Sequence, residues 1–308
     1  MTMTAKKPFL SVYGHITIDQ IVSVERFPNL NETVDILSKT TTLGGTGANI
    51  AIAAAKLGVP TAICAFVGSD IPMKYVKEIE DSGLITDELV TVNDFETSQC
   101  TVLNDAELRQ KVIFYQGPQG YASQIGKDLL KNARESEWVH FCTGEPDYYL
   151  RLMSELSGNS ARVSLDPAQE TYRLWPEERL SRGIPMADAV FCNEYEAKVI
   201  EERMGIGSVL DLDKSLVVKT LGAAGSIARI GDEIVEIPCV QCTKAVDATG
   251  CGDTFRAGFY SGLYHGYSVK ESLILASAVS SFTIERTGAL NNLPEWSAVE
   301  ERASPYLR

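Results

Sequence analysis

The stretch of residues 246–255 places two glycines and two carboxylates where a loop is expected to become a helix. Gly250 and Gly252 let backbone amides approach a bound anion, and the apolar run 254–263 predicts a buried helix whose positive end faces it. Asp253 would repel phosphate unless it had a chemical role. It fits a general base that takes the proton of a substrate hydroxyl while the amides hold a transferred phosphoryl group. The alternative is a capped helix N-terminus.

Short apolar stretches separated by helical segments must position this loop. One helical segment covers about 48–57, and the expected strands are 9–13, 62–67, 138–142, 163–166, 189–193 and 216–220. This alternation indicates parallel βαβ units and therefore an α/β fold.

Two early stretches, about 16–42 and 93–118, do not follow that rhythm. Their residues alternate between polar and apolar, and the turn-like sequence of residues 104–107 predicts a hairpin. We expect them to form an antiparallel sheet that projects from the α/β body as a lid over an active site. Residues 1–308 are then a single domain with an inserted lid.

Composition narrows the class of protein. The 308 residues are 44% hydrophobic, without a run of about 18 apolar residues or a signal peptide, so a cytoplasmic protein without a membrane role is expected. A net charge of -13 with no basic block disfavours nucleic acid as a partner. Such an acidic protein would bind a nucleotide through local amides and a divalent cation, which implies Mg²⁺.

The seven cysteines are scattered through the chain, which favours reduced thiols. Cys239 and Cys242 form a lone C-x-x-C motif without a second pair or suitably spaced histidines, so we expect strand or core thiols rather than a zinc site.

Polar and glycine-rich segments follow the first expected strands, where open α/β sheets bind ligands. Asp19 and Asn49 offer groups for sugar hydroxyls, and the glycines Gly44 and Gly45 permit close approach of a polyol or ribose. The same glycines are also compatible with ordinary turn chemistry before a helix.

Two later strands end in segments suited to a nucleotide. Asn193 and Glu196 could orient waters on Mg²⁺, although a helix cap with an acidic first turn explains them equally. Thr220, Gly222 and Gly225 form a glycine loop suited to phosphates or ribose. The sequence contains neither a P-loop motif nor a dinucleotide-binding G-x-G-x-x-G at the first helix.

Taken in this order, the segments resemble the ribokinase-like PfkB family of carbohydrate and nucleoside kinases, from residue 14 to about 294. The most specific matches are D-x-T-G-x-G-D at 247–253 and G-G-x-x-A-N at 44–49. The resemblance implies a three-layer α/β/α sandwich with a mostly parallel sheet and a small antiparallel β lid.

The resemblance also implies roles for single residues. Asp253 is the catalytic base, and the amides of Thr249, Gly250, Cys251 and Gly252 form the anion hole. The acceptor would meet Asp19, Gly44, Gly45, Asn49 and Glu145; Mg²⁺ and phosphate would lie near Asn193 and Glu196; and the nucleotide would bind at Thr220, Gly222, Gly225 and the loop with Asn292. Many members hold K⁺ beside that loop, for which Asp247 is a candidate ligand.

Cys251 departs from the family pattern, in which Ala is usual. The helix N-terminus should favour its thiolate, whereas Asp247 and Asp253 oppose it. We therefore expect oxidants to inactivate the free enzyme and MgATP to protect it.

The resulting hypothesis is an ATP-dependent kinase that transfers the γ-phosphoryl group to a hydroxymethyl group of a sugar or nucleoside. A nucleoside would need an apolar slot for its base, for which Tyr13, Phe114 and Tyr115 are candidates, although aromatic residues in strands are more often core. Apolar lid edges further predict a homodimer. The alternative function is a non-catalytic sugar or nucleotide sensor, to which a catalytic base would be of no use.

Overall fold

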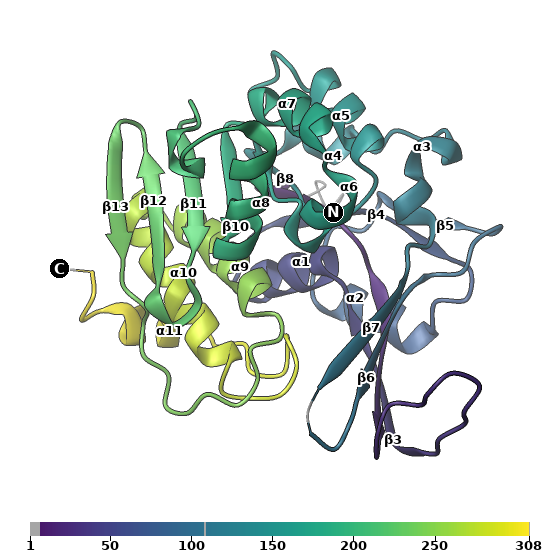
Figure 1. The fold of residues 1–308 in the computed structure, drawn as a ribbon. Coiled ribbons are helices and arrows are strands. Elements are labelled where there is room, and N and C mark those ends of the chain that lie inside the picture. Colours follow the sequence, from purple (N-terminus) through teal and green to yellow (C-terminus); the bar gives the residue numbers. More distant parts are fainter. Residues whose placement is uncertain (1–6, 108, 308) are drawn as a thin grey trace, which may run out of the picture.

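A nine-stranded sheet forms the centre of the protein, and helices cover both of its faces (Figure 1). The computed structural model describes residues 7–107 and 109–307. Across the sheet the order is β13 (Glu233–Ile237), β12 (Ser226–Ile230), β11 (Leu216–Thr220), β10 (Ala189–Asn193), β9 (Arg162–Leu165), β8 (Trp138–Phe141), β1 (Leu10–Tyr13), β4 (Thr61–Gly68) and β5 (Leu89–Val92). Neighbouring strands from β5 to β11 pair in parallel, and β12 and β13 add an antiparallel edge.

The parallel strands bury side chains on both faces, which explains their continuous apolar runs. In β10, Ala189 and Phe191 join one core cluster, whereas Val190 and Cys192 join the other. Each cluster therefore needs its own layer of helices.

Two layers of helices complete the two clusters. On one face lie α1 (Thr46–Lys56), α2 (Met73–Asp81), α9 (Cys251–Tyr264), α10 (Val269–Thr283) and α11 (Trp296–Ala303). On the other lie α3 (Ala122–Ile125), α4 (Lys131–Glu135), α5 (Pro146–Glu155), α6 (Thr171–Leu174), α7 (Glu177–Met186) and α8 (Glu194–Met204). Short 3-10 turns connect them: η1 (Pro118–Tyr121), η2 (Ala168–Glu170), η3 (Val209–Asp211) and η4 (Gly222–Ala224). The predicted three-layer α/β/α sandwich is confirmed.

A second sheet projects from the body beside α1 and α2 (Figure 1). Its order is β3 (Ile36–Gly44), β2 (Thr17–Val24), β6 (Ser98–Asn104) and β7 (Gln110–Tyr115). β6 and β7 form the predicted antiparallel hairpin, and β2 and β3 form a second one. The hairpins are joined by a parallel pairing of β2 with β6, in register from Thr17 opposite Ser98, which alternation within each stretch cannot indicate.

Six predicted strands of the central sheet are present with bounds within one residue. The antiparallel edge strands β12 and β13 and the short β5 were not predicted. The helix behind the glycine loop begins at Cys251 rather than Thr254, so Asp253 lies inside its first turn. Within residues 7–107 and 109–307, no helix is both long and apolar enough to cross a membrane.

Candidate active site

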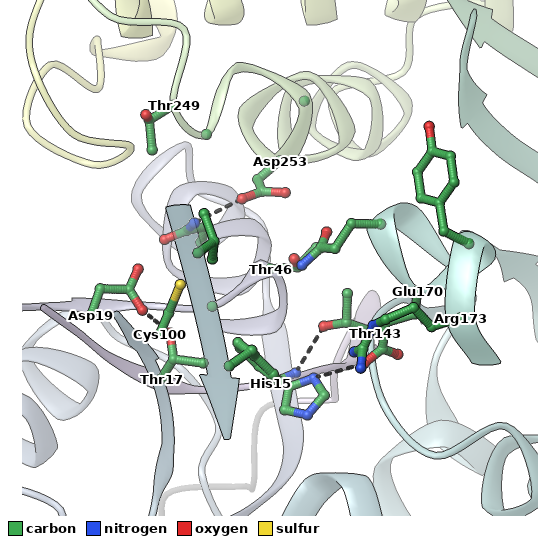
Figure 2. Close-up of a pocket in the computed structure, with 18 residues that line it drawn as sticks. His15, Thr17, Asp19, Thr46, Cys100, Thr143, Glu170, Arg173, Thr249 and Asp253 are labelled. Atoms are coloured by element: carbon green, nitrogen blue, oxygen red, sulfur yellow. Dashed lines mark hydrogen bonds and ion pairs between the residues drawn. The ribbon is translucent and has the colours of Figure 1, made fainter. Parts of the chain in front are cut away.

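A cavity of about 560 Å³ lies where the second sheet meets the carboxyl ends of the central strands. The sheet contributes Thr17, Asp19, Cys100, Val112 and Phe114, and the body contributes His15, Gly45, Thr46, Asn49, Thr143, Gln169, Glu170, Tyr172, Arg173, Thr249, Gly250, Gly252 and Asp253. Figure 2 shows Asp253 and Thr249 at one end of this cavity and His15, Glu170 and Arg173 at the other.

Asp253 is half-buried in the first turn of α9. The Asn49 amide on α1 donates to its Oδ2 at 2.7 Å. Burial raises the pKa of Asp253 to about 7, while the Asn49 hydrogen bond and the charge of Arg256 oppose this rise. A carboxylate with this pKa can accept a proton near neutral pH and is basic enough to assist transfer from a hydroxyl.

Free backbone amides lie beside this carboxylate. Gly250, the N-cap of α9, has φ +75°, and a Cβ there would lie 2.1 Å from Ala289 Cβ, so only glycine fits. The Cys251 and Thr254 amides donate to the Ala248 and Gly250 carbonyls. Within the described chain, the amides of Gly252 and Asp253 donate to no acceptor. They are the unpaired donors with which a helix N-terminus binds an anion.

Asp19 lies on β2 and reaches the cavity from the second sheet. Thr17 Oγ1 donates to its Oδ1 at 2.5 Å, and burial raises the pKa of the carboxyl. Gly44 on the neighbouring strand does not line the cavity, but a Cβ there would lie 2.0 Å from Asp19 Oδ2. Glycine at position 44 therefore makes room for the carboxylate, and Gly45, with φ +96°, turns the chain into α1.

The far end of the cavity is polar. Turned so that its oxygen and nitrogen suit their neighbours, the Gln116 amide donates to His15 Nε2 at 3.1 Å and to Glu170 Oε1 at 3.3 Å, and accepts from Arg173 Nη2 at 2.7 Å. The His15 ring meets Phe114 edge to face at 5.2 Å. Burial lowers the pKa of His15 to about 4 and raises that of Glu170 to about 7. This end offers hydrogen-bonding groups beside an aromatic surface.

A second cavity, of about 370 Å³, opens on the other side of the α9 N-terminus. Gly252 lines both cavities, so a group that bridges them must pass the free amides. The second cavity is lined by Thr220, Gly222, Ala223, Gly225, Cys239, Val240, Gln241, Cys242, Ala245, Ala248, Cys251, Gly252, Phe255, Ser277, Ser280, Ser281 and Ile284. The three residues of the predicted glycine loop are among them.

Cys251 lines the second cavity, but its thiolate is not favoured. Burial, together with the charges of Asp247 and Asp253, raises its pKa to about 11. The expectation of a stabilised thiolate is wrong, because burial and the two carboxylates favour the protonated thiol. Cys239 and Cys242 line the same cavity as partly exposed thiols and are neither core nor paired with each other.

The structure does not bring Glu145 to either cavity. Its Oε2 accepts from the Ser123 amide at 2.6 Å and its Oε1 from the Ser123 hydroxyl, so Glu145 anchors the start of α3. Tyr13 is also elsewhere: it is fully buried, stacks on Phe141 and belongs to the core. Tyr115 is exposed on the second sheet, which leaves Phe114 as the one candidate for a base slot that lines the cavity.

Asn193 and Glu196 form a capping box at the start of α8. Asn193 Oδ1 accepts from the Tyr195 and Glu196 amides, and Glu196 Oε2 accepts from the Asn193 amide at 2.8 Å. Neither residue lines a cavity described above. The helix-cap alternative thus describes the contacts of both side chains in this structure.

Asp247 and Asn292 hold the neighbouring loops. The Asp247 carboxylate accepts from the Thr249 amide and, at 2.9 Å, from the Gly288 amide, and Asn292 Nδ2 donates to the Phe282 carbonyl. In the part of the chain that the structure describes, no three His, Cys, Asp or Glu side chains cluster as a metal site.

Several cavity residues were not predicted. The clearest group follows β9, where Gln169, Glu170, Tyr172 and Arg173 line the far end. A polar cluster directly after the expected strand 163–166 was an available signal, of the same kind that identified the residues after the first strand. Thr46 lies within the motif at 44–49 and Thr143 directly follows the expected strand 138–142, so the same signal was available for both.

Comparison with known proteins agrees with this geometry. The family model "pfkB family carbohydrate kinase" matches residues 7–296. A nucleoside kinase of Methanocaldococcus jannaschii is 31% identical over 307 residues, which cover 99% of both chains. The crystal structure of the nucleoside kinase from that organism, described as an archaeal member of the ribokinase family, superimposes with a TM-score of 0.88 over 96% of this chain and 98% of that chain at 29% identity.

A ribokinase of Arabidopsis thaliana, solved with ribose and ATP, superimposes with a TM-score of 0.82 at 25% identity over 97% of this chain and 99% of that chain. The chain therefore belongs to the pfkB family of carbohydrate kinases and is an ATP-dependent kinase of a sugar or nucleoside.

Proposed function

We propose that the acceptor is a nucleoside, whose 5′-hydroxyl receives the γ-phosphoryl group of ATP. The observation that carries this proposal is the extension of the cavity beyond the residues around Asp19 and Asn49 to Phe114, Tyr172 and Arg173. A free pentose would fill only the part of the cavity around Asp19 and Asn49. A nucleobase fits the extension of the cavity, where an aromatic face and hydrogen-bonding groups lie together. The relative described above as a nucleoside kinase supports the same acceptor.

In this proposal the ribose hydroxyls bind Asp19 and the Asn49 amide oxygen, which has no hydrogen-bond partner in the described chain. The 5′-hydroxyl then lies at Asp253, which accepts its proton. The free Gly252 and Asp253 amides hold the negative charge that spreads over the phosphoryl group. ATP occupies the second cavity with its γ-phosphate directed to Gly252, which the two cavities share.

The residues present fit Mg²⁺ only as an ion carried by the phosphates. Bound in that way, Mg²⁺ would neutralise phosphate charge, and Mg²⁺ commonly keeps several waters. Glu196 lines neither cavity, but it keeps one carboxylate oxygen outside its capping box and would act on such an ion only through water. Asp247 accepts from two backbone amides and would offer its remaining lone pairs to a K⁺ ion. Activity assays in KCl and in NaCl test this role.

Steady-state phosphorylation of a panel tests the acceptor. ADP release from MgATP is measured with the common ribonucleosides, their 2′-deoxy counterparts, ribose and ketohexoses. A nucleoside should exceed ribose in kcat/KM by at least about 100-fold, since the base contacts are lost with ribose. Phe114→Ala should lower kcat/KM for the nucleoside and leave that for ribose within about twofold. A preference for a free sugar would refute the nucleoside assignment while leaving kinase activity intact.

We also propose a homodimer through the second sheet. Both edge strands expose apolar side chains: Ile36 and Leu37 on β3 are 58% and 66% exposed, and Ile113 on β7 is 69% exposed. Such exposure on a sheet edge favours pairing with another copy. Sedimentation should give a dimer that Ile113→Lys dissociates, whereas Ile234→Lys on β13 should not change the mass. A wild-type monomer at micromolar concentration would refute the dimer.

A further inference from the structure

Arg256 is a buried cation one turn behind Asp253 on α9. Its side chain makes two directed contacts: Nε donates to Asp166 Oδ2 at 2.7 Å, and Nη1 donates to the Gly252 carbonyl at 3.2 Å. Arg256 is 5% exposed and Asp166 is 1% exposed. Neither side chain lines a cavity described above, so neither is placed to contact a substrate directly.

The contact with Gly252 acts on a peptide group of the anion hole. The Gly252 carbonyl and the Asp253 amide belong to one peptide unit, and that amide is one of the free donors beside the base. A hydrogen bond to the carbonyl polarises the whole unit and strengthens the amide as a donor. The same contact fixes the orientation of the unit, and small displacements of catalytic groups are costly.

We propose that Arg256, held in place by Asp166, is a positioning residue for phosphoryl transfer that orients and polarises the Gly252–Asp253 peptide beside the base. This inference rests on the proposed role of Asp253. It assigns to Arg256 no contact with either substrate.

Asp166 connects Arg256 and the Gly252–Asp253 peptide to the other end of the acceptor cavity. It follows β9 directly and begins the segment that carries Gln169, Glu170, Tyr172 and Arg173. Within that segment Ala168 has φ +48°, a left-handed conformation that is unfavourable for alanine, so the surrounding contacts must hold it. The Asp166–Arg256 pair therefore ties the residues at the far end of the acceptor to the helix that carries the base.

Arg256 is the cation that compensates the charge of the Asp166 carboxylate. His140 Nε2 lies 3.7 Å from Asp166 Oδ2, but burial lowers the pKa of His140 to about 4, so this ring is neutral at physiological pH. Asp166 Oδ1 has no partner in the described chain. The other charged or titratable groups that interact electrostatically with Arg256, Asp166 or Asp253 include Asp19, Glu196, Cys142, Cys192, Cys251 and Tyr260.

The competing explanation is a buried ion pair that only supports the fold. It predicts lower stability without a specific change in turnover. Positioning predicts that, in the folded fraction, kcat falls while KM for ATP and for the nucleoside hold. The two explanations are separated by kcat, by both KM values and by the pH profile, with melting temperature measured in parallel.

The test uses Arg256→Met, Arg256→Lys and Asp166→Asn in the full chain, with Arg229→Met as the control. Arg229 on β12 also donates to several backbone carbonyls but lines neither cavity. We expect Arg256→Met to lower kcat roughly 10- to 100-fold with both KM values within about threefold, and Arg256→Lys to recover part of the loss. Arg229→Met should lower only the melting temperature.

The pH profiles provide a second readout of opposite sign. Loss of the Arg256 cation raises the pKa of Asp253 and should move the acid limb of kcat to higher pH. Loss of the Asp166 anion lowers it and should move the limb to lower pH, while the plateau still falls because Arg256 loses its anchor.

The outcomes distinguish the inference from the proposed function. If Asp253→Asn abolishes turnover while folded Arg256→Lys, Arg256→Met and Asp166→Asn keep kcat within twofold and the acid limb in place, positioning by Arg256 is wrong and the base stands. If Asp253→Asn keeps near wild-type turnover, the base itself is misassigned. Should Arg256→Met not fold, the near-isosteric Asp166→Asn and the charged Arg256→Lys decide the question by the same criteria.

Discussion

Asn49 on α1 and Asp253 on α9 are 204 positions apart in the sequence and are joined by a 2.7 Å hydrogen bond. The amide nitrogen of Asn49 faces the carboxylate, while its amide oxygen has no partner in the described chain. One side chain can therefore hold the base and an acceptor hydroxyl in a fixed relation. The two most specific sequence motifs of the chain meet at this contact.

Asp253→Asn should lower kcat by about 10² to 10⁴ because the acceptor hydroxyl loses its general base. The amides and both cavities are unchanged, so ATP binding measured by calorimetry should be retained. Turnover near the wild-type rate would remove Asp253 from the mechanism.

Activity should rise with pH through about 7, because Asp253 must be deprotonated to accept a proton and its pKa is about 7. Asn49→Leu removes a donor to the carboxylate, which raises that pKa further and should move the acid limb of kcat upward. Asn159→Leu, in the loop between α5 and β9, is the control and should leave the limb in place. An unshifted limb in Asn49→Leu would show that this hydrogen bond does not tune the base.

The same carboxylate should destabilise the fold at alkaline pH. Its pKa in the folded chain is about 7 against an ordinary value of 3.8, so the protonated form is favoured by folding. The associated stability is full below about pH 4 and is lost as pH rises through 7. Asp253→Asn should therefore be more stable than wild type at pH 8, by on the order of 2 kcal/mol in free energy of unfolding. Denaturant melts at pH 4 and pH 8 should show the gap only at pH 8; equal gaps at both would contradict the linkage.

Gly44→Ala should weaken acceptor binding. A methyl group at this position would lie 2.0 Å from Asp19 Oδ2, so the carboxylate must leave its place in the cavity. We expect KM for the acceptor to rise at least about tenfold while KM for ATP holds. Gly207→Ala is the matched control, since a Cβ there meets only Asp211 Oδ2 at 3.6 Å. Equal KM values in the two variants would show that Asp19 does not need this space.

Cys251 should react slowly with iodoacetamide at neutral pH, because the thiolate is the nucleophile and the pKa of this thiol is about 11. Its labelling rate, followed by mass spectrometry of the peptide that contains it, should climb steadily up to that pH. MgATP should protect it, since Cys251 lines the second cavity. Cys251→Ala should stay active. Rapid labelling at pH 7 would contradict the raised pKa.

Sequence reasoning succeeded where one element carries its own signal. The parallel strands are apolar because both faces are buried, and the glycines before α1 and α9 are required by backbone geometry, so short windows reveal them. It failed where the cause lies elsewhere in the chain. Tyr13 and Phe114 both occupy strands, and only tertiary packing places the first against Phe141 and the second in the cavity.

Electrostatics could not be predicted from local sequence either. The helix N-terminus suggested a reactive Cys251, but burial, the largest cause, together with the nearby carboxylates raises the pKa of its thiol instead. Glu145 follows a strand like other ligand-binding residues, yet Ser123 occupies both of its oxygens. In each case the decisive partner or degree of burial is set by the fold.

The parallel pairing of β2 with β6 has a consequence for synthesis. During synthesis, β2 and β3 are complete once Gly44 has been added. The chain then continues through α1, β4 and α2, and β6 begins only at Ser98. One edge of the first hairpin therefore stays without its partner while more than fifty further residues are translated. Unpaired edges of this kind invite association between nascent chains, and pairings distant in sequence form slowly. The second sheet should thus be the last part of the amino-terminal half to assemble. Its unpaired edge should make the refolding yield of the chain fall as protein concentration rises.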